Sequence, residues 1–427
     1  MNTIDRDHSR VLRLDRRSSH PNLRAAASDL LAQLEATEIR QRRRRAPEQE
    51  RLLHTMEAIV ADIYYAYCDD PSLSLGYSRN KNDYDMPRRY RSVSATHTSV
   101  TVVADFLVAS GYAEQLSGYY RRQDEKENAW ANRGMRSRLR ATAMLEAFLW
   151  ENHAVLPDHL SIARNGELVR LKDANGNLAD YKDTPFTRAM RKQLEGINDL
   201  LARTMINAPK TDEGGNPELT AKCLYRVFND GRFDRGGRFY GPWWTTAKKR
   251  VRSQITINGE PTAELDYSAF HIRLCYHLSG LTPPDRHDLY DFDGTEGLRD
   301  AVKWAVNILL NLKPGMRMPR PKDEKIAALL SGQWSTSKIR RMIERHYAEV
   351  GHWFGAGRGT ELQFIDSEIA AAILDRLTNQ GIACLPVHDS FIVARSHQSL
   401  LHDVMMDTYS TSVSRITGQP SYPVIKT

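Results

Sequence analysis

Cysteine is rare in this chain of 427 residues, and long apolar runs are missing. The four cysteines are far apart and have no CxxC spacing, which excludes the usual zinc motifs and a disulfide framework: Cys68, Cys223, Cys275 and Cys384. No run of about 18 apolar residues occurs, and the N-terminus lacks the apolar core of a secretion signal. We therefore expect a soluble, cytoplasmic protein that has no membrane partner.

Excess positive charge is also scarce outside the N-terminal region. The chain carries a net charge of +7, and residues 1–45 hold 11 Arg against 6 Asp or Glu. The other 382 residues therefore carry a net charge of only +2. Because positive charge favours a polyanionic partner, residues 1–45 are predicted to be a basic arm that binds phosphates. The run Arg42–Arg45 also fits a solvated helix end or a flexible tail.

Residues 46–155 are predicted to form a small, mainly helical domain. They combine an apolar helical stripe from Leu52 to Tyr64, a second helix that begins near Thr96 and ends at Gly111, and β-like segments at 117–122 and 136–141. A further helix is predicted at 143–150. This order of elements resembles a winged helix, whose second helix can enter the major groove of DNA.

Arginines are frequent in this segment and would supply phosphate contacts if it is a winged helix. They are Arg88, Arg89, Arg91, Arg121, Arg122, Arg136, Arg138 and Arg140. In the alternative interpretation the segment is a structural helix bundle, and the arginines only solvate its surface.

Residues 156–217 are predicted to be a connector. Asn175-Gly176 lies between β-like segments at 167–171 and 178–181, which is a strong signal for a hairpin. A helix over 187–205 and a polar linker at 212–217 follow. Residues 218–427 are then predicted to form one α/β unit.

Two segments of that unit, Ala263–Ser268 and Leu385–Ser390, each place an Asp where an apolar run stops. These residues, Asp266 and Asp389, are 123 positions apart. The second segment is typical of a strand, a two-residue tip and a strand, over 382–387 and 390–394. A lone Asp in such a place is usually a cap or turn residue. Two carboxylates brought together at strand ends can hold two Mg²⁺ ions, which predicts phosphoryl transfer by a nucleic-acid polymerase.

Four segments in a fixed order resemble motifs of the superfamily of family A DNA polymerases and phage-type single-subunit RNA polymerases. The first, Phe233–Tyr240, resembles the Asp-x-Arg-Gly-Arg-x-Tyr element of the RNA polymerases, with one extra Gly. Arginines on a glycine-rich turn suit phosphate groups. The resemblance implies that Arg235 or Arg238 contacts the template or product strand.

The second segment, Asp266–Arg273, resembles the first catalytic motif of family A DNA polymerases, Asp-Tyr-Ser-x-x-Glu-x-Arg. The resemblance implies that Asp266 binds both metal ions, that the backbone carbonyl of Tyr267 completes a metal shell, and that Arg273 belongs to the nucleotide site. His271 replaces the family's Glu, which screens the 2′ position of the sugar. Histidine can block a hydroxyl or hydrogen-bond to it, so the sugar preference stays open. A packed core histidine is the alternative.

The third segment places Arg299, Lys303, Asn307 and Asn311 at steps of four along one predicted helix face, with apolar residues opposite. It resembles the fingers helix of both polymerase families. This implies that Arg299 and Lys303 hold the incoming triphosphate and that Asn307 and Asn311 replace aromatic residues at the nucleotide. An ordinary amphipathic helix with solvated charges is the alternative.

The fourth segment, Val387–Phe391, resembles the third motif of phage-type RNA polymerases. It implies that Asp389 is the second metal ligand, and that His388 contacts the phosphate at the primer end or braces the turn. Asp366 and Glu368, on a predicted helix upstream, are expected to have surface or capping roles.

The sequence therefore predicts an α+β fold: a right-hand polymerase palm with reduced helical fingers, preceded by a winged-helix-like domain. The predicted function is template-directed addition of nucleotides to a 3′-hydroxyl with two Mg²⁺ ions, or Mn²⁺. Its partners would be a template, a primer or product strand, and nucleoside triphosphates. DNA and RNA products both stay open, and the mixture of motifs suggests a replicative enzyme of a mobile element or phage. The alternative is a winged-helix DNA-binding replication or regulatory protein with an inactive palm.

Overall fold

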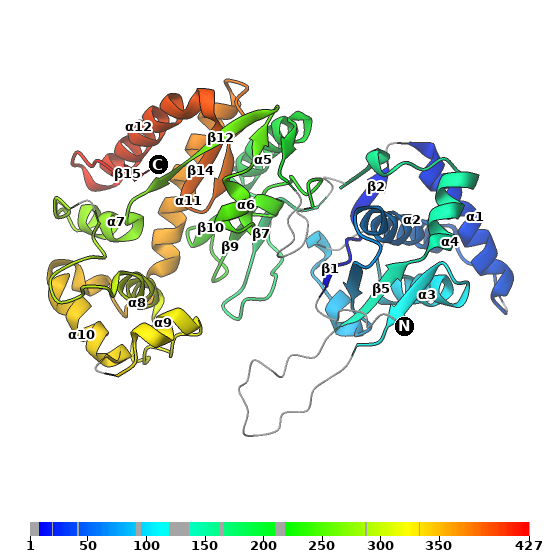
Figure 1. Cartoon of the computed structure of the whole chain (residues 1–427), viewed down its shortest axis with the longest axis horizontal. Coiled ribbons are helices and arrows are strands. Elements are labelled where there is room, and N and C mark those ends of the chain that lie inside the picture. Colours follow the sequence, from blue (N-terminus) through cyan, green and yellow to red (C-terminus); the bar gives the residue numbers. More distant parts are fainter. Residues whose placement is uncertain are drawn as a thin grey trace. The chain divides into compact units, whose positions relative to one another are not determined.

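The computed structural model describes residues 8–18, 20–40, 42–90, 95–118, 136–162, 166–209, 218–286, 288–332 and 334–426, and it is a mixture of helices and sheets (Figure 1). The chain divides into two compact units, here called unit 1 and unit 2. Unit 1 ends at Glu167 and unit 2 begins at Leu168, so the division falls later than the predicted boundary at 155. In the described ranges, no helix has the length and apolar character needed to cross a bilayer.

Two packed helices form the centre of unit 1. Helix α1 (Pro21–Thr37) buries Leu23, Leu30 and Leu34 against helix α2 (Ala46–Asp69). Together with Ala26, Ala27 and Leu31, which are also buried, these positions recur every three to four residues, which places them on one face of α1. The prediction that residues 1–45 form a basic arm is therefore wrong for α1. The arginines around this helix concealed its apolar face.

A sheet in the strand order β1-β3-β5-β4 packs beside these helices. Its strands are β1 (Ser9–Val11), β3 (Ser74–Tyr77), β5 (Ser137–Ala141) and β4 (Ala113–Leu116). Helix α3 (His97–Ala109) leads into β4 through Gly111, whose φ of +79° favours glycine. Strand β4 begins immediately after that turn, where Tyr112 and Ala113 are buried, and residues 119–122 of the strand expected at 117–122 lie outside the described residues.

Unit 1 has further short elements. They are β2 (Arg16–Ser18) paired with β6 (Leu160–Ile162), the 3₁₀ turns η1 (Lys81–Tyr84), η2 (Arg88–Tyr90) and η4 (Pro157–His159), helix α4 (Ala143–Ala147) and the π-helical turn η3 (Phe148–Asn152). Helix α4 and η3 together cover the helix predicted at 143–150.

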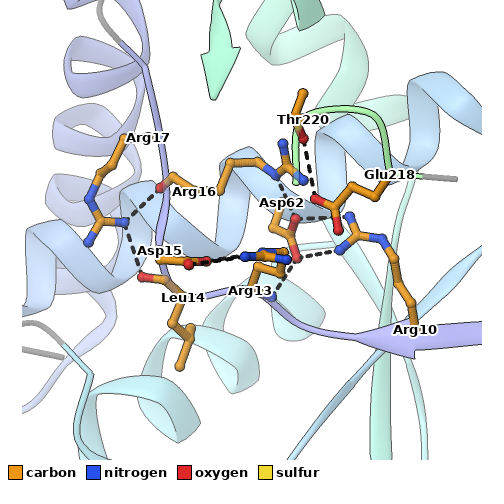
Figure 2. Close-up of polar contacts among 9 residues, drawn as sticks. All are labelled: Arg10, Arg13, Leu14, Asp15, Arg16, Arg17, Asp62, Glu218 and Thr220. Atoms are coloured by element: carbon orange, nitrogen blue, oxygen red, sulfur yellow. Dashed lines mark hydrogen bonds and ion pairs between the residues drawn. The ribbon is translucent and has the colours of Figure 1, made fainter. Parts of the chain in front are cut away.

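A buried carboxylate connects the N-terminal strands of unit 1 to α2 (Figure 2). Asp62 is 0% exposed and accepts hydrogen bonds from Arg16 Nε at 2.6 Å and from the backbone N–H of Arg13 at 2.7 Å. Arg10 donates two further bonds to it, at 2.9 and 3.2 Å. A buried charge is tolerated only when it is paired and hydrogen-bonded, so this cluster fixes the chain before α1 on the side of α2.

The main sheet of unit 2 is antiparallel, in the order β13-β14-β12-β11-β8, with β15 also paired to β12. Its strands are β13 (Leu385–Val387), β14 (Ser390–Ala394), β12 (Glu260–Tyr267), β11 (Thr256–Ile257), β8 (Ile206–Asn207) and β15 (Ile425–Lys426). The predicted strand, two-residue tip and strand are confirmed as β13, His388-Asp389 and β14. At the tip, His388 has a φ of +60°.

A second sheet of unit 2 has the order β10-β9-β7, made by β10 (Gly236–Tyr240), β9 (Tyr225–Phe228) and β7 (Val169–Leu171). Helix α11 (Gly359–Thr378) packs on β10. A Cβ atom on Gly237 would lie 2.6 Å from Ser367 Oγ of α11, so the glycine permits this close approach. The hairpin expected at Gly176 is reduced to one bridge between Lys172 and Leu178.

Unit 2 contains further helices, of which α12 (Gln398–Thr417) packs on β12 and β14 of the main sheet. Helix α5 (Pro185–Arg203) confirms the helix predicted at 187–205, and helix α7 (Phe270–Leu278) follows β12. Helices α11 and α12 pack side by side. Helices α8 (Arg299–Asn311), α9 (Glu324–Leu329) and α10 (Thr336–His346) lie together, drawn in yellow and yellow-green in Figure 1. The short elements are η5 (Trp243–Thr245), α6 (Lys249–Arg252), η6 (Ala348–Trp353) and η7 (Arg395–His397).

Candidate active site

The structure brings Asp266 and Asp389 to neighbouring positions on the main sheet of unit 2. In the register of β12 and β14, Asp266 lies opposite Ser390, the residue that follows Asp389. The backbone N–H of Tyr267 also donates to the Asp389 carbonyl at 3.4 Å. Antiparallel pairing thus joins two acidic residues that the sequence separates by 123 positions.

The electrostatics of Asp266 are unusual. Burial, followed by the charges of Asp389 and Glu264, raises its pKa to about 7, while Lys303 and Lys426 oppose the shift. The nearby cations therefore compensate the two carboxylates incompletely at neutral pH. A divalent cation would relieve this repulsion, so the residues present fit a metal site.

The side chains that could hold such an ion are few. Among the residues that the structure describes, no cluster of three or more His, Cys, Asp or Glu groups is arranged to hold a metal. Mg²⁺ in phosphoryl-transfer sites is commonly bound through one or two carboxylates together with water and substrate phosphates. Asp266 and Asp389 would supply the two carboxylates of such a site.

We expect the contribution of Asp266 to the free energy of unfolding of the metal-free protein to fall as the pH rises from about 4 to 7. The folded pKa, about 7, lies above the ordinary value of 3.8, so folding disfavours the charged form. The loss is complete above pH 7. The Asp266→Asn variant should therefore be more stable than the parent at pH 8, by up to about 4 kcal/mol. The two proteins should converge near pH 4.

Thermal unfolding of both proteins at pH 4, 6 and 8, in EDTA and in Mg²⁺, measures this effect. Mg²⁺ should narrow the difference at pH 8 because it compensates the parent's carboxylates. An Asp266→Asn variant that is less stable than the parent at pH 8 in EDTA would contradict the prediction.

A second polar cluster lies on β10, α7 and α11. Arg238 donates to Asp366 Oδ2 at 2.6 Å, and His271 Nε2 lies 3.2 Å from the same oxygen and 3.2 Å from Arg238 Nη2. The side chain of Asp366 is 1% exposed. Burial, the largest influence, raises its pKa, but the hydrogen bond from His271 and the charge of Arg238 together hold the pKa below its ordinary value. The expected surface or capping role of Asp366 is therefore wrong, because its buried carboxylate holds Arg238 and His271 in place.

Arg238 and His388 lie near Asp389. Burial lowers the pKa of Arg238, but Asp366 and then Asp389 raise it above its ordinary value. Burial, followed by the charge of Arg238, lowers the pKa of His388, whose ring meets Tyr240 edge-on at 6.4 Å. Arg238 rather than Arg235 therefore belongs to this group, because Arg235 forms an ion pair with Glu361.

The predicted face of α8 is present, with Val302, Ala305, Val306 and Leu309 buried on the opposite side. Lys303 is exposed, and its charge acts on Asp266. Arg299 is paired with Asp288 at 2.5 Å and with Asp300 at 3.2 Å.

The two asparagines of α8 differ in their surroundings. Asn311 donates to the Asn307 carbonyl at 2.8 Å, and its side chain fills the space where a Cβ on Gly359 would lie. Asn311 therefore helps to pack α8 against the start of α11. Asn307 is exposed.

Two residues assigned to the nucleotide site have buried side chains. Arg273 is 5% exposed and donates to the carbonyls of Ser268 at 3.1 Å and Arg286 at 2.7 Å. Tyr267 is 3% exposed and donates through its hydroxyl to the Met405 carbonyl at 2.7 Å. Both side chains hold the fold together, and the role expected of Arg273 in the nucleotide site stays a prediction. The metal-binding role expected of the Tyr267 carbonyl stays a prediction.

The arginines of unit 1 that are expected to bind nucleic acid differ in their exposure. Arg138 is only 3% exposed within β5, so its predicted surface contact is wrong. Arg136 is 58% exposed and lies 3.5 Å from Asp83. Arg121 and Arg122 lie outside the described residues.

Two features near the site were not found from the sequence. Lys426 on β15 lies opposite Asp266 in the strand register, and it is 3.8 Å from Asp288. The sequence gives no signal for Lys426 beyond a short apolar segment near the C-terminus. Glu368 is paired with Arg226 at 2.7 Å, and the Arg226 side chain is 1% exposed, so Glu368 compensates a buried charge.

Comparisons with known proteins give little further information. No family model matches the sequence, and no curated protein matches it. Among solved structures the chain is similar to the POL domain of Pol1 from M. smegmatis in complex with DNA primer-template and dNTP, with 11% identity and a TM-score of 0.31. The match covers 96% of this chain and 66% of that one, so this chain spans slightly less than two thirds of its length. A similarity of this size carries no argument about function, which has to come from the residues of the site.

Proposed function

We propose that unit 2 is a template-directed nucleic-acid polymerase that adds nucleotides to a 3′-hydroxyl. One observation carries the proposal: Asp266 on β12 pairs with Ser390, the residue after Asp389 at the tip before β14, and burial followed by the charge of Asp389 raises the pKa of Asp266 to about 7. Two carboxylates that are buried close together repel each other, and divalent cations would compensate their charge. Such an arrangement is typical of a functional site.

In this proposal Asp266 and Asp389 hold two Mg²⁺ ions, and the Tyr267 carbonyl is a further ligand. The ions would supply charge neutralisation at the phosphate during attack of the 3′-hydroxyl and departure of pyrophosphate. Mn²⁺ would fit the same oxygen donors. The protein's contribution is then to position the strands and to stabilise their charges.

The basic residues around the pair have separate proposed roles. Lys303, whose charge already acts on Asp266, would bind the triphosphate and stabilise the leaving pyrophosphate. Arg299 would join it after exchanging its partner Asp288 for a phosphate oxygen. Arg238, fixed by Asp366, would contact a backbone phosphate of the product strand, and His388 would brace the turn that carries Asp389.

His271 is proposed to set the preference for the sugar of the incoming nucleotide. Its side chain is 16% exposed and is oriented by Asp366 and Arg238, so it is neither free nor a simple core residue. We expect His271→Ala to change the ratio of ribonucleotide to deoxyribonucleotide use by about tenfold. A side chain that contacts the 2′ position of the sugar distinguishes a ribonucleotide, which has a hydroxyl there, from a deoxyribonucleotide, which lacks it. The exposed His352, replaced by alanine, is the matched control.

Competition between NTPs and dNTPs in primer extension measures this ratio. The control variant should keep the parent's ratio. An unchanged ratio in His271→Ala, with incorporation intact, would mean that this histidine only supports Arg238.

A strongly basic surface supports a nucleic-acid partner for unit 2. Residues 313–345, from the end of α8 to α10, carry nine Lys or Arg and three Asp or Glu, a net charge of +6 against +7 for the whole chain. The exposed members are Lys313, Arg317, Arg320, Lys322, Lys325, Arg341 and Arg345. The charge count for the body of the chain concealed this surface because acidic residues elsewhere cancel it.

We expect the triple variant Arg317→Ala, Arg320→Ala and Lys325→Ala to weaken nucleic-acid binding. The slope of log K against log salt concentration should decrease by about 2 to 3 in magnitude, because each lost phosphate contact removes close to one released counterion. The matched control replaces three exposed cations of unit 2, Lys182, Arg188 and Lys192. Fluorescence anisotropy with a labelled primer-template at several salt concentrations measures both. Equal slopes for the two triple variants would contradict the assignment.

Unit 1 is proposed to bind nucleic acid as a winged helix. The order of α2, β3, α3, β4 and β5, with β5 between β3 and β4, supports this interpretation. Its charges support it less. Helix α3 contains no Lys or Arg, and its exposed Asp105 is paired with Arg79 at 2.7 Å. We therefore propose that α3 recognises shape or base edges rather than phosphates.

The winged-helix topology also carries the second candidate, a DNA-binding replication or regulatory protein with an inactive palm. Primer extension separates the two candidates. DNA and RNA templates, primed and unprimed, are each supplied with the four NTPs or the four dNTPs in Mg²⁺ and in Mn²⁺. Incorporation under any condition supports the polymerase. Tight binding with no incorporation under all of them supports the regulator.

A further inference from the structure

Unit 1 contains a cavity of about 820 Å³ that the proposed polymerase reaction does not use. Its walls come from the ends of β1 and β3, from residues 81–86 and 90, from the first turn of α3, and from Arg136. Cavities of roughly 300–1,000 Å³ are the size that takes small ligands or single groups of larger ones. All the described residues that line it belong to unit 1.

Three rings in the wall are held in place through their polar atoms. The Tyr84 hydroxyl donates to a backbone carbonyl at 2.7 Å, and the Tyr77 hydroxyl donates to Gln115 at 2.7 Å. The ring of His97 is hydrogen-bonded to the Arg79 carbonyl at 2.9 Å and meets Tyr84 edge-on at 5.7 Å. Because their polar atoms are engaged within the protein, the half-buried rings of Tyr84 and His97 offer fixed apolar surfaces to a ligand, whereas Tyr77 is 3% exposed and contributes little ring surface.

The charge of the wall limits what can enter. In the part of the wall that the structure describes, the charged residues are Asp15, Asp83, Asp85, Lys81 and Arg136. With His97 neutral they sum to −1, so the wall does not favour a phosphate inside the cavity. The carboxylates and the Asn82 amide instead match a neutral, planar group that carries N–H donors.

We propose that this cavity binds an unpaired nucleobase that has an exocyclic amino group: adenine, cytosine or guanine. Unpaired bases are recognised by stacking on aromatic side chains. Asp and Glu carboxylates accept hydrogen bonds from the amino group of cytosine. Lys81, which is exposed, and Arg136, whose side chain is 58% exposed, can meet the flanking phosphates. The inference rests on the proposed nucleic-acid partner but not on catalysis by unit 2.

Methionine-methyl NMR of the full chain tests the proposal, because Met86 lines the cavity. Met205 of unit 2 is 54% exposed, lies outside the basic surface of residues 313–345 and serves as the internal control signal. The probes are the oligonucleotides oligo-dC, oligo-dA and oligo-dT, since thymine lacks the amino group. The Met86 signal should saturate with oligo-dC and oligo-dA at about one tenth of the concentration needed with oligo-dT, a ratio typical of one well-bound base.

Two variants localise the effect. Asn82 and Asp83 are exposed members of the wall, so Asn82→Ala and Asp83→Ala should leave the fold intact and reduce the preference for oligo-dC to less than about twofold. Asp29→Asn on α1, where the side chain is 63% exposed and lies outside the described wall, should keep the full preference. A Met86 signal that ignores all three oligonucleotides, or that responds equally to oligo-dC and oligo-dT, would overturn the proposal.

The two proposals fail separately. Asp389→Asn should leave the Met86 response unchanged. No incorporation together with an intact preference for oligo-dC would remove the polymerase and keep the base site. Incorporation together with a silent Met86 signal would remove the base site alone.

Discussion

Asp389→Asn and Asp266→Asn are each expected to reduce nucleotide incorporation by about 10³-fold or more, with binding of the primer-template retained. An amide has the size of the carboxylate but lacks its charge, so it cannot replace a carboxylate ligand of Mg²⁺. Asp266 on β12 and Asp389 at the tip before β14 lie beside each other in the strand register, and each variant removes one of the two proposed carboxylate ligands. Primer extension under single-turnover conditions measures the loss, and fluorescence anisotropy measures the binding.

The stability of these variants separates loss of chemistry from loss of fold. Asp266→Asn removes a charge whose pKa is raised to about 7 by burial and by Asp389, so the variant should unfold no earlier than the parent. An inactive protein that is as stable as the parent, or more stable, is the expected signature of a functional site that costs stability.

Asp407→Asn is the matched control for both variants. Asp407 is exposed on α12, where it pairs with Arg376, and the variant should keep incorporation within about twofold of the parent. Incorporation by Asp266→Asn or Asp389→Asn within tenfold of the parent would rule out the two-carboxylate mechanism.

Asp62→Ala is expected to destabilise unit 1 by about 3–5 kcal/mol, the cost of breaking a buried ion pair from one side. Asp62 and Arg16 are both 0% exposed and are joined at 2.6 Å, so the variant leaves the Arg16 guanidinium buried without this carboxylate. The backbone N–H of Arg13 loses its acceptor as well. Figure 2 shows these donors converging on the one side chain.

Urea unfolding followed by far-UV circular dichroism measures this change, since unit 1 holds long helices that report its unfolding. Asp29→Ala on α1 is the control, because the Asp29 side chain is 63% exposed and its pairing with His153 should contribute less than about 1 kcal/mol. A loss for Asp62→Ala as small as that for Asp29→Ala would mean that the cluster does not hold the N-terminal strands to α2.

The sequence alone was sufficient wherever the signal is local. The strand, tip and strand around His388-Asp389, the apolar face of α8 and the helix near α5 follow from alternation, from turn residues and from helical spacing within a few residues. The fold class as a mixture of helices and sheets follows for the same reason. The positions of Asp266 and Asp389 at strand ends were also local features.

The sequence was misleading where burial decides the role of a charged residue. Arg273 is expected at the nucleotide site from the motif it resembles, and Arg138 and Asp366 are expected at a surface from their residue type. Each is 5% exposed or less. The hydrogen-bond partners of Asp366 come from the distant elements β10 and α7, so no pattern around the residue itself reports them.

Composition likewise averaged over distance. The basic surface of residues 313–345 was concealed because acidic residues elsewhere in the chain cancel its charge in the total. The apolar face of α1 was concealed because arginines lie near it in the sequence. Local periodicity thus determined the helices, the strands and the two candidate acids. Only the tertiary structure decided that those acids are neighbours, that Lys426 faces them and that Asp366 fixes Arg238. The physical reason is that strand pairing and burial depend on segments far apart in the chain, and these long-range pairings set the electrostatics of the site.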